Sequence, residues 1–146
     1  MKYGFTADYK IATSSDTISY IYQVYTFTGG AHGATDIFPI TLNQNLQVLK
    51  AEDILPEKSL EKVSKLAITD LLKQKRDKMK SYGMSAKDID ESLKDTTWLK
   101  EGTNPVRDNY SHVWIDGENI VISFGQYQVG PYVEGVYEVK IPKSEI

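Results

Sequence analysis

The spacing of apolar residues changes twice along this chain, from a strand pattern to a helix pattern and back. Residues 18–27 (ISYIYQVYTF) are dense in β-branched and aromatic side chains, as strands are. Leu60, Val63, Ala67 and Leu71 instead recur at intervals of three and four, as on one face of a helix. A block of helices between two blocks of strands is typical of an α+β fold with a mainly antiparallel sheet, rather than of alternating β-α-β units.

Turn and capping residues mark the ends of these elements. The polar segment 13–17 predicts a hairpin turn, and Asp116-Gly117 predicts another. Gly83 is expected to end the long helix, and Ser85 to begin the capping box of a shorter one. In chain order the predicted elements are strands 3–11, 18–27, 37–42 and 46–49, a helical turn within 51–56, helices from about 60 to 83 and from about 86 to 95, and strands 110–115, 120–124 and 136–142.

Residues 18–27 also predict how the first sheet is buried. One face of this strand carries Tyr20 and Tyr22, and the other carries Ile21, so both faces are largely apolar or aromatic. We therefore expect a central strand that is covered on both sides. Pro39 has no backbone N–H to donate, which indicates an edge position or a bulge for its strand.

The length of the chain predicts one domain with one core. A chain of 146 residues buries enough surface to fold without metal or disulfide support. We divide this single domain, 1–146, into N-terminal strands with a glycine turn (1–50), a helical segment (51–96) and C-terminal strands (97–146), so that a long and a shorter helix are inserted between the two groups of strands.

Composition excludes several classes of function. The net charge of −3 and the sequence pI near 5.4 argue against nucleic acid as a partner, because binding to phosphates needs a basic face. Cysteine is absent, which removes thiol catalysis, disulfides and thiolate metal sites. No apolar stretch has the length of a membrane span, so we expect the domain itself not to insert into a membrane.

A cluster of glycines surrounds the first histidine. Gly29, Gly30 and Gly33 flank His32 in the sequence GGAHG, where neither a regular strand nor a helix can continue. The turn either presents the imidazole and backbone N–H groups to a ligand, or simply reverses the chain with His32 bonded locally. The residue types alone favour the second interpretation.

Neither metal nor nucleophilic chemistry has a clear signature. His32 and His112 would need a third ligand such as Asp36 to hold zinc, and no HxH or HExxH spacing is present. There is also no GxSxG elbow for a catalytic serine. We therefore predict no catalytic residues, no metal and no cofactor.

The chain contains ten tyrosines, and two of them stand in a glycine-bounded segment near its end. Tyr127 and Tyr132 lie in GQYQVGPYVEG, where they serve either sheet packing or the recognition of sugar or protein. The basic stretch 73–80 (KQKRDKMK) is typical of a solvated helix face, with contact to anionic wall polymers as the alternative.

The order of these motifs resembles a known family. TGGAHG at 28–33, a hairpin, an AEDIL connector at 51–55 and SFGQYQVGPYVEGVYEVKIP at 123–142 together resemble the RsiV-like extracytoplasmic domain family, a domain of unknown function. This domain type occurs in lysozyme-sensing anti-sigma factors and in peptidoglycan deacetylases. The resemblance runs from about residue 3 to residue 146. The matching residues are Gly29, Gly30, His32 and Gly33 in the first motif, and Tyr127, Gly130, Pro131, Tyr132 and Gly135 in the second.

The resemblance implies a binding or sensing domain that works outside the bacterial cytoplasmic membrane. In the full-length protein such a domain is membrane-anchored or secreted, and the expected partners are lysozyme or peptidoglycan. In the deacetylases the chemistry belongs to another domain. The expected ligand-binding residues are Gly29, Gly30, His32, Gly33, Tyr127 and Tyr132.

Two other functions stay open at this point. His32 on its glycine turn suits an enzyme that modifies cell-wall polysaccharide, or an accessory domain of such an enzyme, because loops commonly carry function. A domain that only spaces other modules is the third possibility. It predicts that His32 and Tyr132 lie apart.

Overall fold

The computed structural model of the chain describes residues 3–146 and has an α+β fold with two antiparallel sheets. The first sheet has the order β1-β2-β3-β4 and the second β5-β6-β7. The strands are β1 (Gly4–Thr13), β2 (Thr17–Phe27), β3 (Ala34–Asn43), β4 (Val48–Leu49), β5 (Val113–Asp116), β6 (Asn119–Phe124) and β7 (Tyr137–Pro142). The α-helices are α1 (Ala51–Ile54), α2 (Leu60–Ser81), α3 (Ala86–Ser92) and α4 (Thr97–Gly102), and the 3-10 helices are η1 (Glu57–Ser59), η2 (Arg107–Tyr110), η3 (Tyr132–Glu134) and η4 (Lys143–Glu145).

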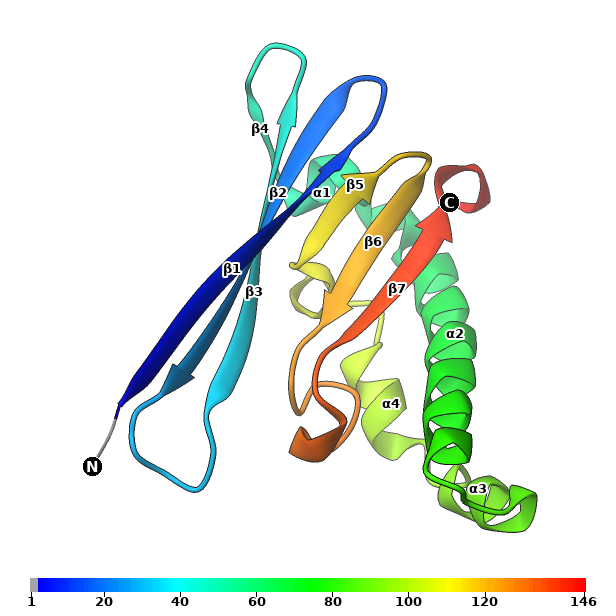
Figure 1. Cartoon of the computed structure of the whole chain (residues 1–146). Coiled ribbons are helices and arrows are strands. Elements are labelled where there is room, and N and C mark those ends of the chain that lie inside the picture. The colour runs from blue at the N-terminus through cyan, green and yellow to red at the C-terminus, as the bar shows by residue number, and fades with distance from the viewer. Residues whose placement is uncertain (1–2) are drawn as a thin grey trace.

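The second sheet forms the middle layer of the molecule. Figure 1 shows helix α2 along one side of it and the long first sheet on the other. Strands β5 and β6 are almost continuously apolar (VWI and IVISF) and are buried on both faces, as strands enclosed between two layers are. The first sheet and the second therefore face each other, and the side chains on their inner faces line the space between them.

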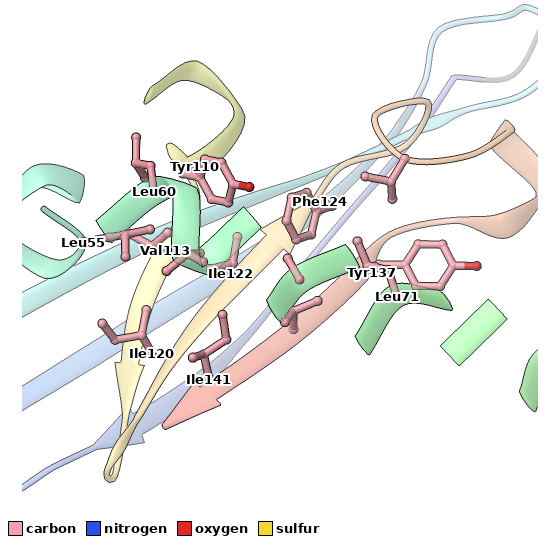
Figure 2. Packing of buried hydrophobic residues seen from close by; sticks show 14 of the residues in the cluster. Leu55, Leu60, Leu71, Tyr110, Val113, Ile120, Ile122, Phe124, Tyr137 and Ile141 are labelled. Carbon is pink, nitrogen blue, oxygen red and sulfur yellow. The ribbon is translucent and has the colours of Figure 1, made fainter. Parts of the chain in front are cut away.

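The main core lies between the second sheet and the helices. Figure 2 shows Leu60 and Leu71 of α2 packed against Ile122, Phe124 and Tyr137 of the sheet. These side chains keep the helical spacing of α2 and the two-residue alternation of β6 and β7. Burial of this face is what holds α2 against the sheet.

A smaller cluster joins the two sheets. Ile21 and Ile37 of the first sheet pack against Trp114 and Val121 of the second. Nearby, the Ser19 hydroxyl donates a hydrogen bond of 3.0 Å to the carbonyl of Ile115. The contact covers only part of the long first sheet, so the two sheets meet at this cluster and separate beyond it (Figure 1).

Several predictions from local signals are confirmed. The fold is α+β, and Gly83 ends α2 with a φ of +80°. The Ser85 hydroxyl accepts from the backbone N–H of Asp88 at the start of α3. Gly117, with a φ of +58°, lies in the β5–β6 turn. At Pro39 strand β3 pairs with β2 alone, because β4 reaches only Thr41 and Leu42; the edge position is confirmed.

The prediction that strand 18–27 is covered on both faces is wrong. Strand β2 is central in its sheet, but Tyr22 on its outer face is exposed and lies beside Tyr9, with ring centroids 6.4 Å apart. Only the inner face, with Ser19 and Ile21, is buried against the second sheet. The alternation of side chains along this strand assigned its residues to the two faces correctly. It does not say which layer, if any, packs on each face.

Other differences concern the helices. Helix α3 ends at Ser92, and helix α4 opens the segment 97–146, which the sequence assigns to strands. The basic stretch 73–80 is not solvated throughout, since Lys75 is buried. No helix within residues 3–146 combines the length and the apolar character that a membrane crossing needs.

Candidate functional site

The glycine turn and the late aromatic segment meet at one end of the two sheets. The glycine turn joins β2 to β3, and the aromatic segment joins β6 to β7. Gly29 takes a φ of +84°, which favours glycine. Gly33 is buried against Tyr25, and a Cβ at position 33 would lie 2.4 Å from the Tyr25 ring. The turn needs glycine at both positions, for conformation at one and for space at the other.

His32 is held between the two motifs. Its ring stacks on Tyr132, with centroids 3.8 Å apart and ring planes at 23°. Nδ1 lies 3.2 Å from the carbonyl of Gly33, and Nε2 lies 3.1 Å from the hydroxyl of Tyr127. Because a carbonyl only accepts, Nδ1 is the donor, and Nε2 of the neutral ring then accepts from Tyr127. Both ring nitrogens are engaged.

Tyr127 adopts an uncommon backbone conformation. Its φ of +65° is in the left-handed region, which few non-glycine residues occupy. The indole N–H of Trp98 donates to the Tyr127 carbonyl, and the two rings lie nearly parallel with centroids 6.4 Å apart. Such residues concentrate at functional sites when their surroundings hold them in place. Together Trp98, Tyr127, Tyr132 and His32 form an aromatic cluster.

A cleft of about 340 Å³ opens beside this cluster. Its walls come from both sheets and combine polar groups with apolar surface. The lining residues are Thr26, Thr28, His32, Gly33, Ala34, Thr35, Asp36, Ile37, His112, Ser123, Gly125, Gln126, Tyr127 and Tyr132. A cleft with aromatic surface at one end and amide, hydroxyl and imidazole groups along its walls suits a small polar ligand with an apolar face.

Glutamine side chains fix the aromatic segment to its surroundings. Gln126 Oε1 accepts a hydrogen bond of 2.9 Å from the backbone N–H of Thr35, which ties this segment to β3. Gln128 donates from Nε2 to the carbonyls of Gly102 and Asn109, at 3.1 and 3.0 Å. The segment is therefore bonded to β3, to α4 and to η2 rather than left free in solvent.

An ion pair holds the η3 turn from the other side. Lys75 of α2 is buried and pairs with Glu134, and Tyr137 donates to the same carboxylate at 2.8 Å. Burial raises the pKa of Tyr137, and the hydrogen bond to the Glu134 carboxylate raises that pKa further. Tyr132 and Glu134 are the two ends of η3, so this ion pair positions the turn that carries the stacked tyrosine.

The structure brings together most of the predicted site residues. His32, Gly33, Tyr127 and Tyr132 line the cleft, whereas Gly29 and Gly30 lie in the turn and not in the cleft wall. The condition set for a purely spacing domain, that His32 and Tyr132 lie apart, is not met. That these residues bind a ligand stays a prediction.

His112 and Asp36 line the same cleft as His32. Within residues 3–146, however, no three His, Cys, Asp or Glu side chains gather in a group that could hold a metal ion. The sequence analysis missed Trp98 and Gln126, whose side chains form hydrogen bonds with backbone groups distant in the sequence. No local motif marks such a role.

The close contact at Gly33 leads to a first prediction. Gly33→Ala is expected to lower the free energy of unfolding by about 1 kcal/mol, because the methyl group must displace the Tyr25 ring, which is partly free to move. Gly30→Ala is the matched control, since nothing lies within 4 Å of its Cβ position, and its effect should stay within about 0.5 kcal/mol. Urea denaturation measures both. Equal stabilities for the two variants would contradict this packing.

Comparison with known proteins places this arrangement in a family. Residues 52–144 match the model of a family described as "Protein of unknown function (DUF3298)". A curated relative, the peptidoglycan-N-acetylmuramic acid deacetylase PdaC of Bacillus subtilis (strain 168), is 32% identical over 141 residues. The match covers 94% of this chain and 27% of the deacetylase, so the chain spans about a quarter of that relative. These matches confirm the resemblance to a domain of unknown function that is found in a peptidoglycan deacetylase.

Solved structures share the fold. A DUF3298 family member from Bacteroides fragilis NCTC 9343 superposes with a TM-score of 0.66 at 20% identity, covering 97% of this chain and 52% of that one. A DUF3298 family protein from Pseudomonas aeruginosa PAO1 gives a TM-score of 0.63 at 15% identity, covering 98% and 60%. At these identities the likeness shows the fold alone.

Proposed function

The chain belongs to the DUF3298 family of proteins of unknown function, and from this we propose that it is a non-enzymatic, extracytoplasmic domain that binds cell-wall glycan. The name of its deacetylase relative supports the choice of ligand, because that protein acts on peptidoglycan. A location in the bacterial cell wall follows from the same proposal.

The observation that carries the proposal is the aromatic cluster beside a cleft whose walls combine polar groups with apolar surface. The rings of Tyr127 and Tyr132 offer apolar surface of the kind that packs against the C–H faces of sugars. The hydroxyl, amide and imidazole groups of the cleft wall supply donors and acceptors for sugar hydroxyls. A cleft already formed before the ligand arrives also reduces the cost of ordering on binding.

The engagement of His32 supports a binding role over a catalytic one. A general base must reach the proton that it removes, so a ligand would have to displace the Tyr127 hydroxyl from Nε2 before His32 could act on it. In His32 one ring nitrogen bonds the Gly33 carbonyl, the other bonds the Tyr127 hydroxyl, and the ring stacks on Tyr132. The imidazole thus serves as part of the surface on which a ligand rests.

Calorimetric titration with soluble peptidoglycan fragments tests this function. We expect micromolar binding by the wild type, and Tyr132→Ala should weaken it about tenfold, the loss of roughly one aromatic contact. Tyr82→Ala is the matched control, because Tyr82 is an exposed tyrosine outside the cleft. Silence with the fragments contradicts the proposal. Lysozyme, the partner implied for some domains of this type, is titrated in parallel, and binding to lysozyme alone would assign the site to protein recognition instead.

One observation favours an enzyme as the second candidate. His112, Ser123 and Asp36 share the cleft with His32, so residues capable of acid–base and nucleophilic chemistry face one space. An enzyme that modifies wall polysaccharide would release acetate or reducing ends from peptidoglycan. This activity should disappear in His32→Ala, and turnover that survives the substitution would contradict a role for His32 in catalysis.

A further inference from the structure

The cleft at His32 is one end of a longer groove between the two sheets. A second hollow, of about 450 Å³, shares Thr35 and Gln126 with the cleft. A third, of about 100 Å³, shares Gln23 and Glu138 with the second. Hollows that share lining residues adjoin one another, so the three are neighbouring sections of one groove where the sheets separate, with the Gln126–Thr35 hydrogen bond at the boundary of the first two.

Strand β2 gives the length of this groove. Ile21 lines the third section and Gln23 the second from the inner face of the strand, and the strand then continues to Thr26 and Thr28, which border the cleft at its end. An extended chain from Ile21 to Thr28 covers about 20 Å. A single sugar occupies only one section of such a groove, whereas a linear oligomer can lie along all three.

Amide side chains distinguish the middle section. Gln126 accepts from the Thr35 N–H through Oε1, which leaves its NH₂ group without a bond to any of residues 3–146. Gln74 donates from Nε2 to Asp70 and to the Glu138 carbonyl, at 2.7 and 2.9 Å, which leaves its own carbonyl to accept. A free amide donor and a free amide acceptor are the partners that the C=O and N–H of an N-acetyl group require.

The charge of the groove favours a ligand without phosphate groups. In the middle section Glu138 is the one charged residue among those that the structure describes, and Lys10 neutralises it through contacts of 2.7 and 2.9 Å. The remaining charged residues of the other two sections are Asp8 and Asp36. With acidic groups at both ends and no unpaired cation, the groove disfavours wall polymers that carry phosphate groups.

We propose that this groove binds an extended oligomer of N-acetylated sugars. The aromatic cluster holds one end of the oligomer, and the glutamine-lined middle section holds N-acetyl groups along it. This inference rests on the proposed function, since it names the class and the length of the ligand for the same site.

Oligomers of β-1,4-linked N-acetylglucosamine of increasing length, and their deacetylated counterparts, are the probes for calorimetric titration. Affinity should rise with each added unit until the groove is filled. Deacetylated oligomers of the same length should bind about tenfold more weakly, because the amides of the middle section lose their partners.

Two variants separate the sections. Gln23→Leu should weaken binding of long oligomers about tenfold and leave the shortest unchanged, as expected for a residue remote from the aromatic cluster. Gln23 is exposed, so the fold should tolerate the change. Gln44→Leu, which alters an exposed glutamine in the β3–β4 turn, is the matched control.

Each failure has its own signature. Equal affinity for short and long oligomers would overturn the extended groove and leave glycan binding intact. Equal affinity for acetylated and deacetylated oligomers would overturn the role of the glutamines. Absence of binding to every oligomer and to peptidoglycan fragments alike would overturn the inference and the proposed function together.

Discussion

Trp114→Ala is expected to lower the free energy of unfolding by about 3–5 kcal/mol, which is the usual cost of removing a buried tryptophan. Trp114 is only 1% exposed and lies between the sheets with Ile21 and Ile37. Lys10, whose Nζ is 5.0 Å from the centre of the indole, loses this contact as well. Urea denaturation followed by circular dichroism measures the change.

The other tryptophan provides the control for this experiment. Trp98 is 43% exposed and packs against the aromatic segment rather than between the sheets. Trp98→Ala should therefore cost about 1 kcal/mol, the hydrogen bond to the Tyr127 carbonyl included. If both variants lose the same stability, the small cluster does not hold the sheets together. If the cluster does hold them, Trp114→Ala should also weaken the proposed glycan binding, because the walls of the groove belong to different sheets.

Lys75→Met should cost about 3 kcal/mol, because it leaves the Glu134 carboxylate largely buried without its cation. A second substitution, Glu134→Gln, made in the Lys75→Met background, should recover part of this loss by removing the unpaired charge. Lys94→Met is the matched control, since Lys94 and Glu91 form an exposed pair whose loss should cost less than about 1 kcal/mol.

Lys75→Met also tests whether the ion pair positions the candidate site. The ion pair holds η3, and η3 carries Tyr132 against His32, so Lys75→Met should also shift the NMR signals of the His32 ring. Lys94→Met should leave those signals in place. A large loss of stability with unchanged His32 signals would mean that the ion pair supports the core and not the turn.

Local sequence signals predict where the helices and strands of this fold begin and end. They predict less well which faces of those elements are buried. Gly83 and Gly117 end or turn the chain for reasons contained in their own backbone conformation. Helix α4, in contrast, is too short to show periodicity, and it ends at Gly102, where a Cβ would meet the Gln128 carbonyl oxygen at 1.9 Å. That constraint comes from a segment far along the chain and leaves no trace in the residues around α4.

The candidate site follows the same rule. Both motifs are recognisable from the sequence, because glycine clusters and aromatic loops are unusual in regular structure. That the two motifs lie together in the fold cannot be recognised from the sequence, since it depends on how the two sheets align. Trp98 and Gln126 take part through bonds to backbone groups, and Gln23 through its place on an inner face, so nothing in the adjacent residues distinguishes them.

The boundary of the family match divides the candidate site. Residues 52–144 contain α2 and the second sheet, whereas β1, β2 and β3 lie before residue 52. One side of the groove is thus built by the segment that matches the family model, residues 52–144. The facing side is built by strands β1, β2 and β3, which lie outside that match. A relative with a different N-terminal array would keep its family membership and acquire a new preference, so ligands cannot be transferred between such proteins on the shared half alone.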